Sequence, residues 1–280
     1  MELITIKSEQ LTALISPIGA EIHSVKDNAG KEFIWEGDPA VWGSHTPILF
    51  PVAGALRDNC YELDGVRYPM NKHGFARNAP FQVEKTGENF VTLLYNEKQE
   101  GFPFEYDFRI TYTAEGNQIK VAFDVSSRDE RPFYFSVGSH EAYCTPEGFE
   151  NYELHFDEEE TLIHSLLEGP LNNHETQLIA ENTKVLPLKN EYFTIDALIF
   201  RSLKSRGVAL KGCGRKIHVS YPDHPVLLIW TKPGAKLVCI EPWCNGPDFT
   251  DADHRIDHKF GFLRLEKGQT INRTHVITFE

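Results

Sequence analysis

Hydrophobic and polar residues alternate with a period of two along most of this chain, which restricts the folds that it can adopt. In the segment 119–125 the odd positions are Ile, Val, Phe and Val, and the even positions are Lys, Ala and Asp. The segment 106–112 alternates in the same way, and Glu-Gly-Asn at 115–117 separates the two runs. Because successive side chains of a strand point to opposite faces, these residues predict an antiparallel hairpin with one buried face.

Similar short runs recur along the chain and predict further strands. They lie at 3–6, 90–95, 133–137, 152–156, 217–221, 226–230, 237–241 and 276–279. Turn signals separate them, such as Asp64-Gly65, Tyr221-Pro222-Asp223 and Lys232-Pro233-Gly234. No segment repeats apolar residues every ~3.6 positions over three turns. The sequence therefore predicts an all-β (mainly β) protein with few short helices, built as a large antiparallel β-sandwich or barrel.

The chain is long enough for two average domains, but we expect a single domain over residues 1–280. Its length of 280 residues is one that β-sandwiches reach as one domain. No linker rich in Gly, Ser or Pro interrupts it, and no segment repeats at a fixed period. The stretch 158–190 is acidic and weakly patterned. It is expected to form a loop-rich excursion on the surface, with a lid over a site as the alternative.

Charge and sequence motifs exclude several classes of function. The net charge of −13, from 41 acidic and 28 basic residues, would repel a nucleic acid backbone. No apolar segment reaches ~18 residues, and the first residues lack a basic region followed by a long apolar run. We therefore expect no membrane span and no secretory signal, and a cytoplasmic monomer or homodimer. The chain has no P-loop, no complete dinucleotide-binding glycine motif and no G-x-S-x-G nucleophile motif.

The sequence also predicts no metal site. Its five cysteines form no C-x-x-C pair, which suits reduced thiols better than disulfides or a zinc site. His254 and His258 lie four positions apart near three aspartates and would approximate a metal site on a helix. The glutamate of an H-E-x-x-H motif is absent, however.

Three short segments offer side chains that transfer protons. Glu241 ends the apolar run 237–240, and burial there raises a carboxyl pKa toward that of a usable base. His140 follows an apolar run and Gly138-Ser139, so we expect it at a strand end, where an imidazole with a pKa near ~6.5 can donate a proton. His73 is expected on a loop with its ring available. Together these residues offer a general acid and a general base, without a nucleophile or a metal.

These residues occur in an order that resembles the aldose 1-epimerase (galactose mutarotase-like) superfamily, and more closely its LacX-like branch. The resemblance covers nearly the whole chain and rests on the motifs Pro47-Ile48-Leu49-Phe50-Pro51, His73-Gly74-Phe75-Ala76-Arg77, Gly138-Ser139-His140, Asp196-Ala197-Leu198 and Glu241-Pro242-Trp243. It implies a galactose mutarotase-like β-sandwich whose concave face binds a hexose. It also implies an isomerase that needs no cofactor.

The resemblance further implies a role for each candidate residue. Glu241 would take the proton from the anomeric hydroxyl, and His140 would protonate the ring oxygen, so that the ring opens and closes to the other anomer. His73 would lie near O1 and O5 of the sugar. The residues expected to bind the sugar are Asp196 and either Arg57 or Arg77. Independently of the resemblance, Trp42, Phe75, Tyr143 and Trp243 could supply an aromatic face for the sugar ring, with a place in the core as the alternative for each.

Several alternatives stay open at this level. The motif from His73 to Arg77 resembles the hexose-6-phosphate mutarotase branch, in which Arg77 would meet a phosphate, so the substrate can be a neutral aldose or a phosphosugar. A non-catalytic sugar-binding or sugar-sensing protein would use the same concave sheet. A glycoside hydrolase would need two carboxylates beside one bond, and only Asp196 and Asp248 could accompany Glu241.

Overall fold

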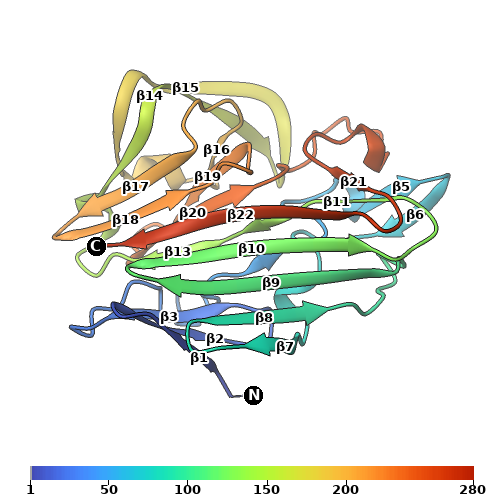
Figure 1. Ribbon diagram of the computed structural model, residues 1–280. Coiled ribbons are helices and arrows are strands. Elements are labelled where there is room, and N and C mark those ends of the chain that lie inside the picture. Colours follow the sequence, from blue (N-terminus) through green and yellow to red (C-terminus); the bar gives the residue numbers. More distant parts are fainter. Residues whose placement is uncertain (1) are drawn as a thin grey trace.

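Residues 2–280 form antiparallel strands in curved, packed sheets, as Figure 1 shows for this computed structural model. A sheet of 15 strands makes up most of the molecule, together with one sheet of three strands and two sheets of two strands. The predicted all-β fold, a large antiparallel sandwich of the galactose mutarotase-like type, is confirmed.

The strands of the main sheet lie side by side in an order that differs from their order in the sequence. That order is β4 (Ile48–Leu49), β12 (Gly138–Ser139), β20 (Leu237–Trp243), β19 (Val226–Trp230), β16 (Leu198–Phe200), β14 (Glu153–Glu168), β17 (Gly207–Gly212), β18 (Arg215–Ser220), β22 (Thr270–Phe279), β10 (Gln118–Ser127), β9 (Tyr106–Glu115), β8 (Phe90–Tyr95) and β7 (Gln82–Thr86). Two more strands lie beside this path, β13 (Glu141–Cys144) next to β20 and β15 (Leu171–Pro187) next to β14.

The smaller sheets and the helical turns are short. The sheets contain β1 (Ile4–Lys7), β2 (Leu11–Ile15) and β3 (Ile22–Asp27), then β5 (Cys60–Leu63) with β6 (Val66–Pro69), and β11 (Phe133–Phe135) with β21 (Leu263–Leu265). The 3₁₀ turns of residues 2–280 are η1 (Arg57–Asn59), η2 (Ala76–Asn78), η3 (Phe149–Asn151), η4 (Asn190–Phe193) and η5 (Ile256–His258). Within this part of the chain, no helix has the length and apolar character needed to cross a membrane.

The hairpin predicted from the alternating residues lies in the main sheet between β22 and β8. β9 and β10 pair with Ile119 opposite Ala114 and Val125 opposite Phe108. Every second residue of both strands is buried, and β1 and β2 pack against this region of the sheet. In the core the rings of Phe50 and Phe108 stack with their centroids 4.2 Å apart. The apolar face that the alternation indicates is therefore the face that builds the core.

The prediction of loops over 158–190 is wrong. These residues lie mostly in β14 and β15, strands of 16 and 17 residues that form the hairpin at the top of Figure 1. Their ladder shifts register between His155 and Glu160 and at further points as far as Leu167. Each shift interrupts the alternation, and most side chains of β15 are exposed, so the sequence shows no period of two there.

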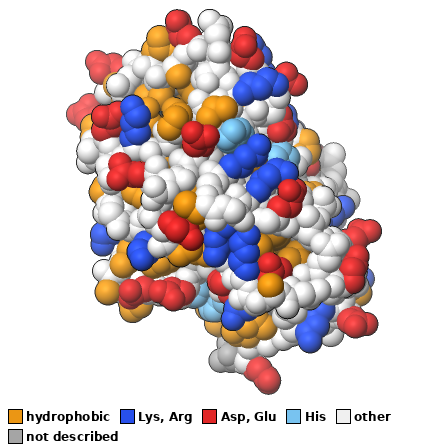
Figure 2. Space-filling view, turned by 90° about the vertical axis from the view of Figure 1, so that its left-hand side faces the viewer, with side chains coloured by type: hydrophobic (Ala, Val, Ile, Leu, Met, Phe, Trp, Pro, Cys, Tyr) orange, Lys and Arg blue, Asp and Glu red, His pale blue; other side chains and the backbone are white. Residues whose placement is uncertain are grey.

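Figure 2 shows acidic, basic and hydrophobic side chains interspersed over one face of the molecule. The net charge of −13 is thus spread over this face among basic groups, which form clusters of only a few side chains. This face therefore presents mixed charge and no continuous basic surface among the described residues.

A close backbone contact fixes the loop that carries His73. The amides of Phe75 and Ala76 donate hydrogen bonds to the carbonyl oxygen of Phe50 over 3.0 and 3.2 Å. Gly74 lies between them and His73 with φ +68°, and a Cβ at this position would approach the Phe50 oxygen to 2.1 Å. Only glycine allows this approach without moving the backbone, so the loop conformation depends on Gly74.

Gly74→Ala is expected to lower the free energy of unfolding by clearly more than Gly65→Ala. Both glycines have positive φ, but a Cβ on Gly65 would meet nothing within 4 Å. Gly65→Ala should cost about 1 kcal/mol from backbone strain alone. Gly74→Ala should cost about 1–3 kcal/mol more, because the added carbon must displace the Phe50 backbone. Urea unfolding of the two variants measures the difference, and equal losses would contradict the close contact.

Candidate active site

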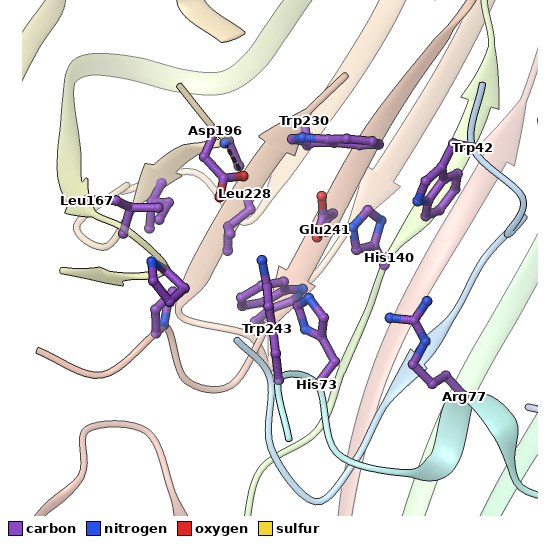
Figure 3. Close-up of a pocket in the computed structure, with 15 residues that line it drawn as sticks. Trp42, His73, Arg77, His140, Leu167, Asp196, Leu228, Trp230, Glu241 and Trp243 are labelled. Carbon is purple, nitrogen blue, oxygen red and sulfur yellow. Dashed lines mark hydrogen bonds and ion pairs between the residues drawn. The ribbon is translucent and has the colours of Figure 1, made fainter. Parts of the chain in front are cut away.

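A cavity of about 310 Å³ lies over β19 and β20 and brings together segments that are far apart in the sequence. Figure 3 shows Glu241 and His140 at its centre, with Trp230 above them and His73 and Trp243 below. Asp196 and Leu167 lie to one side of this pair, and Arg77 and Trp42 lie to the other. The structure thus brings His73, Arg77, His140, Asp196, Glu241 and Trp243 together around one space.

Glu241 is a buried carboxyl group without a hydrogen-bond partner. It points from the middle of β20, opposite Leu228 of β19, and only 1% of the residue is exposed. Within residues 2–280, neither of its carboxyl oxygens makes a hydrogen bond. Burial raises the pKa of Glu241 well above its usual value, and the opposing effect of the Lys72 charge does not cancel this rise. A buried acidic group without a hydrogen bond is costly for stability, which makes Glu241 a candidate functional residue.

His140 lies beside Glu241, between two aromatic rings. Its Nε2 is 3.4 Å from Oε2 of Glu241, close enough for an ion pair although the two atoms do not form a hydrogen bond. Trp42 stacks on the imidazole with centroids 5.0 Å apart, and Trp230 meets it nearly edge-on. Burial lowers the pKa of His140 to about 3, assisted by the charges of Arg77 and Lys72. Burial therefore favours the neutral ring of His140 at neutral pH.

The residues on both sides of His140 hold its position from the opposite face of the sheet. Ser139 Oγ donates a hydrogen bond to Glu141 Oε2 over 2.6 Å. The other carboxyl oxygen of Glu141 lies 2.6 Å from Nε2 of His275, which is fully buried on β22. Because neighbouring side chains alternate between faces, these buried contacts leave the His140 ring directed at the cavity.

His73 contributes a second neutral imidazole. Its Nδ1 accepts a hydrogen bond from the amide of Gly54 over 3.1 Å, so in the neutral ring the proton is carried by Nε2. Burial lowers the pKa of His73 well below its usual value, and the charges of Lys72 and Arg77 act in the same direction. We expected this ring to be available on a loop. It is in fact 6% exposed, although it does line the cavity.

Two cations and one carboxylate line the rest of the polar wall. Lys72 and Arg77 both reach the cavity from the loop that carries His73. In the described part of the chain neither forms an ion pair, and Arg77 makes one long hydrogen bond, 3.5 Å to Ser44. Asp196 is held by the amide of Ala197, which donates to its Oδ1 over 2.8 Å.

Arg57 does not line this cavity. Its Nη1 donates a hydrogen bond to the carbonyl oxygen of Ala252 over 2.8 Å. Asp248 is also engaged elsewhere, in a buried ion pair with Lys259 at 2.6 Å. Of the two arginines expected to bind a sugar, the structure therefore brings only Arg77 to the cavity, and Asp248 does not accompany Glu241.

The aromatic candidates divide into two groups. Trp42 and Trp243 line the cavity, whereas Phe75 and Tyr143 pack in the hydrophobic core. Trp230 also lines the cavity, and the sequence analysis missed it. The turn predicted at 232–234 joins β19 to β20, which places Trp230 opposite Cys239, two residues before Glu241. Counting residues back from this turn would have identified Trp230.

Two groups of side chains could approach a metal ion. Donor atoms of His140, Cys239 and Glu241 lie within 4.8 Å of one another, and so do those of Glu21, His23 and His45. Burial raises the pKa of the Cys239 thiol well above its usual value, which opposes the thiolate form that binds metals.

The histidines 254 and 258 do not share a helix or a common ligand position. His254 pairs with Asp58 at 2.8 Å, and His258 pairs with Asp253 at 2.6 Å.

The chain is similar to sugar epimerases and their relatives over its full length. The family model described as aldose 1-epimerase matches residues 2–278. The plasmid-encoded protein LacX of Lactococcus lactis subsp. lactis is 32% identical, with 98% of each chain covered. A galactose mutarotase related enzyme from Lactobacillus acidophilus has a solved structure that matches with a TM-score of 0.92 and 30% identity, covering 99% of this chain and 97% of the other.

Two further solved structures agree with this fold. A galactose mutarotase-like protein from Lactobacillus casei matches with a TM-score of 0.92 and 27% identity, covering 99% of this chain and 100% of the other. A galactose 1-epimerase from Lactobacillus acidophilus NCFM matches with a TM-score of 0.76 over 99% of this chain and 94% of the other, but only 12% of residues are identical. The last match shows a shared fold alone.

The free energy of unfolding of Glu241→Gln is expected to rise above that of the wild type as the pH increases. Burial raises the folded-state pKa of Glu241 above the unfolded value near 4.5, so the wild type loses stability as the pH rises from that value toward the folded-state pKa. Glutamine resembles the protonated acid and does not ionise. The variant should match the wild type near the unfolded pKa and exceed it by about 1 kcal/mol or more at about pH 8.

Urea unfolding at the two pH values measures this difference. Glu181→Gln, at an exposed carboxylate, is the control and should show no such trend. A difference that stays constant or falls with rising pH would show that the protein holds Glu241 as a carboxylate.

Proposed function

The chain belongs to the aldose 1-epimerase family, and we propose that it interconverts the α and β anomers of a hexose by opening and closing the sugar ring. The observation that carries this proposal is the buried carboxyl group of Glu241, without a hydrogen-bond partner in residues 2–280, at 3.4 Å from the ring of His140. An acid and a base this close suit a reaction that removes one proton and delivers another at adjacent atoms. Such a reaction needs neither a nucleotide nor a metal ion.

The proton steps follow from the chemistry of a hemiacetal. Glu241 takes the proton from the O1 hydroxyl, and His140 gives a proton to the ring oxygen O5. The bond between C1 and O5 breaks as C1 and O1 form a carbonyl, and the aldehyde rotates about the bond between C1 and C2. Addition of the O5 hydroxyl to the other face of C1 returns both protons and closes the ring as the other anomer.

For these steps the pair of Glu241 and His140 must carry one proton. Burial favours that proton on Glu241 in the empty cavity, because it raises the carboxyl pKa and lowers the imidazole pKa. Sugar hydroxyls that donate to the unpaired carboxyl oxygens would stabilise the carboxylate and lower its pKa. The proton would then move to Nε2 of His140, and the two groups would titrate as one coupled pair.

The surrounding residues fit roles in holding the sugar. With its proton on Nε2, His73 can donate a hydrogen bond to O1 or O5. Asp196, whose Oδ1 is fixed by a backbone amide, can accept from hydroxyls on the far side of the ring. Trp42 and Trp243 offer aromatic surface to the C–H groups of the sugar.

A phosphorylated hexose is a second candidate substrate, supported by Lys72 and Arg77. Both cations line the cavity without a carboxylate partner among the described residues, in a protein whose net charge is −13. A phosphate bound between them would receive hydrogen bonds from two charged donors. A non-catalytic sugar sensor is the remaining alternative, and it would need no proton transfer between Glu241 and His140.

Glu241→Gln and His140→Asn should each lower kcat for anomer exchange by about 10²-fold or more, since each removes one proton-transfer group. Sugar affinity should change little because both side chains keep their approximate shape. Polarimetry or NMR exchange with α-glucose, α-galactose and glucose 6-phosphate measures the rate, with Glu181→Gln as the control. Dialysis against EDTA should leave the rate unchanged. Wild-type protein that binds these sugars but exchanges them at the buffer rate would support the sugar sensor.

Arg77→Met distinguishes the two substrate classes. If Arg77 binds a phosphate, the variant should lose about 1.5–3 kcal/mol of affinity for glucose 6-phosphate and almost none for glucose. If Arg77 holds a hydroxyl, both sugars should bind more weakly by a similar and smaller amount. Arg57→Met is the matched control, because the Arg57 side chain lies outside the cavity. Titration calorimetry of both sugars measures the losses, and an equal loss in a folded Arg77→Met variant would exclude the phosphate role.

A further inference from the structure

Two histidines and a glutamate meet outside the candidate active site, where β3 lies beside the segment that leads into β4. Glu21 directly precedes β3, His23 lies on this strand, and His45 comes shortly before β4. One donor atom from each of the three side chains lies within 4.8 Å of a donor atom of both others. Glu21 and His23 are two positions apart at the start of the strand, so their side chains leave the same face.

Hydrogen bonds fix one carboxyl oxygen of Glu21 and leave the other available. The amides of His45 and Thr46 donate to Oε1 of Glu21 over 2.8 and 3.0 Å. Thr46 Oγ1 accepts from the amide of Ile22 over 2.7 Å and donates to its carbonyl oxygen over 3.1 Å. These contacts hold the segment of His45 against β3. Oε2 of Glu21 lies 3.6 Å from Nε2 of His23, and it is the carboxyl oxygen that can bind a ligand.

The two imidazole rings are stacked, and only His23 has room to turn. The ring centroids lie 4.0 Å apart, with 11° between the ring planes. A Cβ on Gly37 would approach Cε1 of His45 to 2.5 Å, so the backbone there packs against the His45 ring. The side chain of His23 is 28% exposed. Since the lone pair of an imidazole nitrogen lies in the ring plane, His23 must turn out of the stack before both rings can bind one ion.

The donor atoms determine which kind of ion fits. Two imidazole nitrogens and one carboxylate suit a divalent first-row transition metal such as Zn²⁺, whereas Mg²⁺ and Ca²⁺ prefer oxygen ligands alone. A cavity of about 280 Å³, lined by these three residues and by Ser16 and Ser44, leaves space for the ion and a water ligand. Arg77 also lines this cavity, and its charge opposes a cation that the Glu21 carboxylate attracts.

We propose that Glu21, His23 and His45 form a binding site for a divalent first-row transition metal ion, with Zn²⁺ as the ion that fits. The ion would join β3 to the segment before β4. In this segment the carbonyl oxygen of Pro47 accepts a hydrogen bond from the amide of His140 over 3.0 Å. The ion would therefore stabilise a neighbour of the candidate active site without taking part in the proton steps. This inference does not depend on the proposed function.

Titration calorimetry with Zn²⁺ alone, on protein first dialysed against EDTA and then against buffer, measures the affinity. His23→Ala and Glu21→Gln should each weaken Zn²⁺ binding about tenfold or more, because each removes one ligand. His155→Ala is the matched control and should leave the affinity unchanged. The His155 side chain is 29% exposed and lies 3.1 Å from a single carboxylate, without a second imidazole in a metal-binding group of the described residues.

Two further measurements separate this site from other places where Zn²⁺ could bind. Cys239→Ala removes a donor from the group of His140, Cys239 and Glu241 and should leave the affinity unchanged. Zn²⁺ should also raise the Tm of the wild type, and raise the Tm of His23→Ala by less at the same concentration, because the ion binds the folded state.

Binding that weakens in His23→Ala and Glu21→Gln, but not in His155→Ala or Cys239→Ala, supports the site. A wild type that binds no Zn²⁺ overturns the proposal. Binding that His23→Ala and Glu21→Gln leave unchanged also overturns it. In that case, a loss in Cys239→Ala would assign the ion to the candidate active site, and a loss in His155→Ala would assign it to exposed histidines.

Discussion

The burial of Glu241 and His140 is the constraint on which the rest of this structure depends. An ionisable carboxyl group with no hydrogen-bond partner in residues 2–280 destabilises the fold unless it stays protonated. The β19–β20 pair keeps it there because strand residues on both sides of Glu241 are buried and cannot turn outward. The protein therefore maintains a reactive group at the expense of stability, and a ligand that offers hydroxyl groups would recover part of this loss.

The main sheet meets this constraint by dividing polar groups between its two faces. Glu241 and His140 face the cavity, while Ser139 and Glu141 face inward. There the Ser139 hydroxyl donates to Glu141, and Glu141 meets His275 on β22. Short hydrogen bonds join Ser139, Glu141 and His275 on the inner face. On the cavity face, the carboxyl oxygens of Glu241 make no hydrogen bond within residues 2–280. Hydrogen bonds thus restrain the inward-facing side chains of this segment, whereas the carboxyl oxygens of Glu241 on the neighbouring strand make none within residues 2–280.

The sequence predicts the parts of this arrangement that depend on local patterns. Alternation reveals β9 and β10, and an acidic residue at the end of an apolar run reveals Glu241. The sequence does not predict β14 and β15, because bulges and exposed side chains remove their alternation. It also does not show which of Arg57 and Arg77 lines the cavity. The position of Arg77 depends on the contact between Phe50 and Gly74, which fixes the loop before Arg77. Such a long-range contact cannot be predicted from the residues beside either arginine. The neutral state of His140 likewise follows only from its tertiary burial.

The long hairpin that the sequence failed to indicate lines part of the cavity that contains Glu241 and His140. Leu167 near the end of β14 lines this cavity and also a second cavity of about 400 Å³, which comes largely from the hairpin and the segment 191–198. Glu241, by contrast, lies on β20, and His140 lies between β12 and β13. Glu241 and His140 thus lie on other elements than the hairpin side chains that line the second cavity. Among the described residues, the two cavities share only Leu167, Asp196 and Ala197.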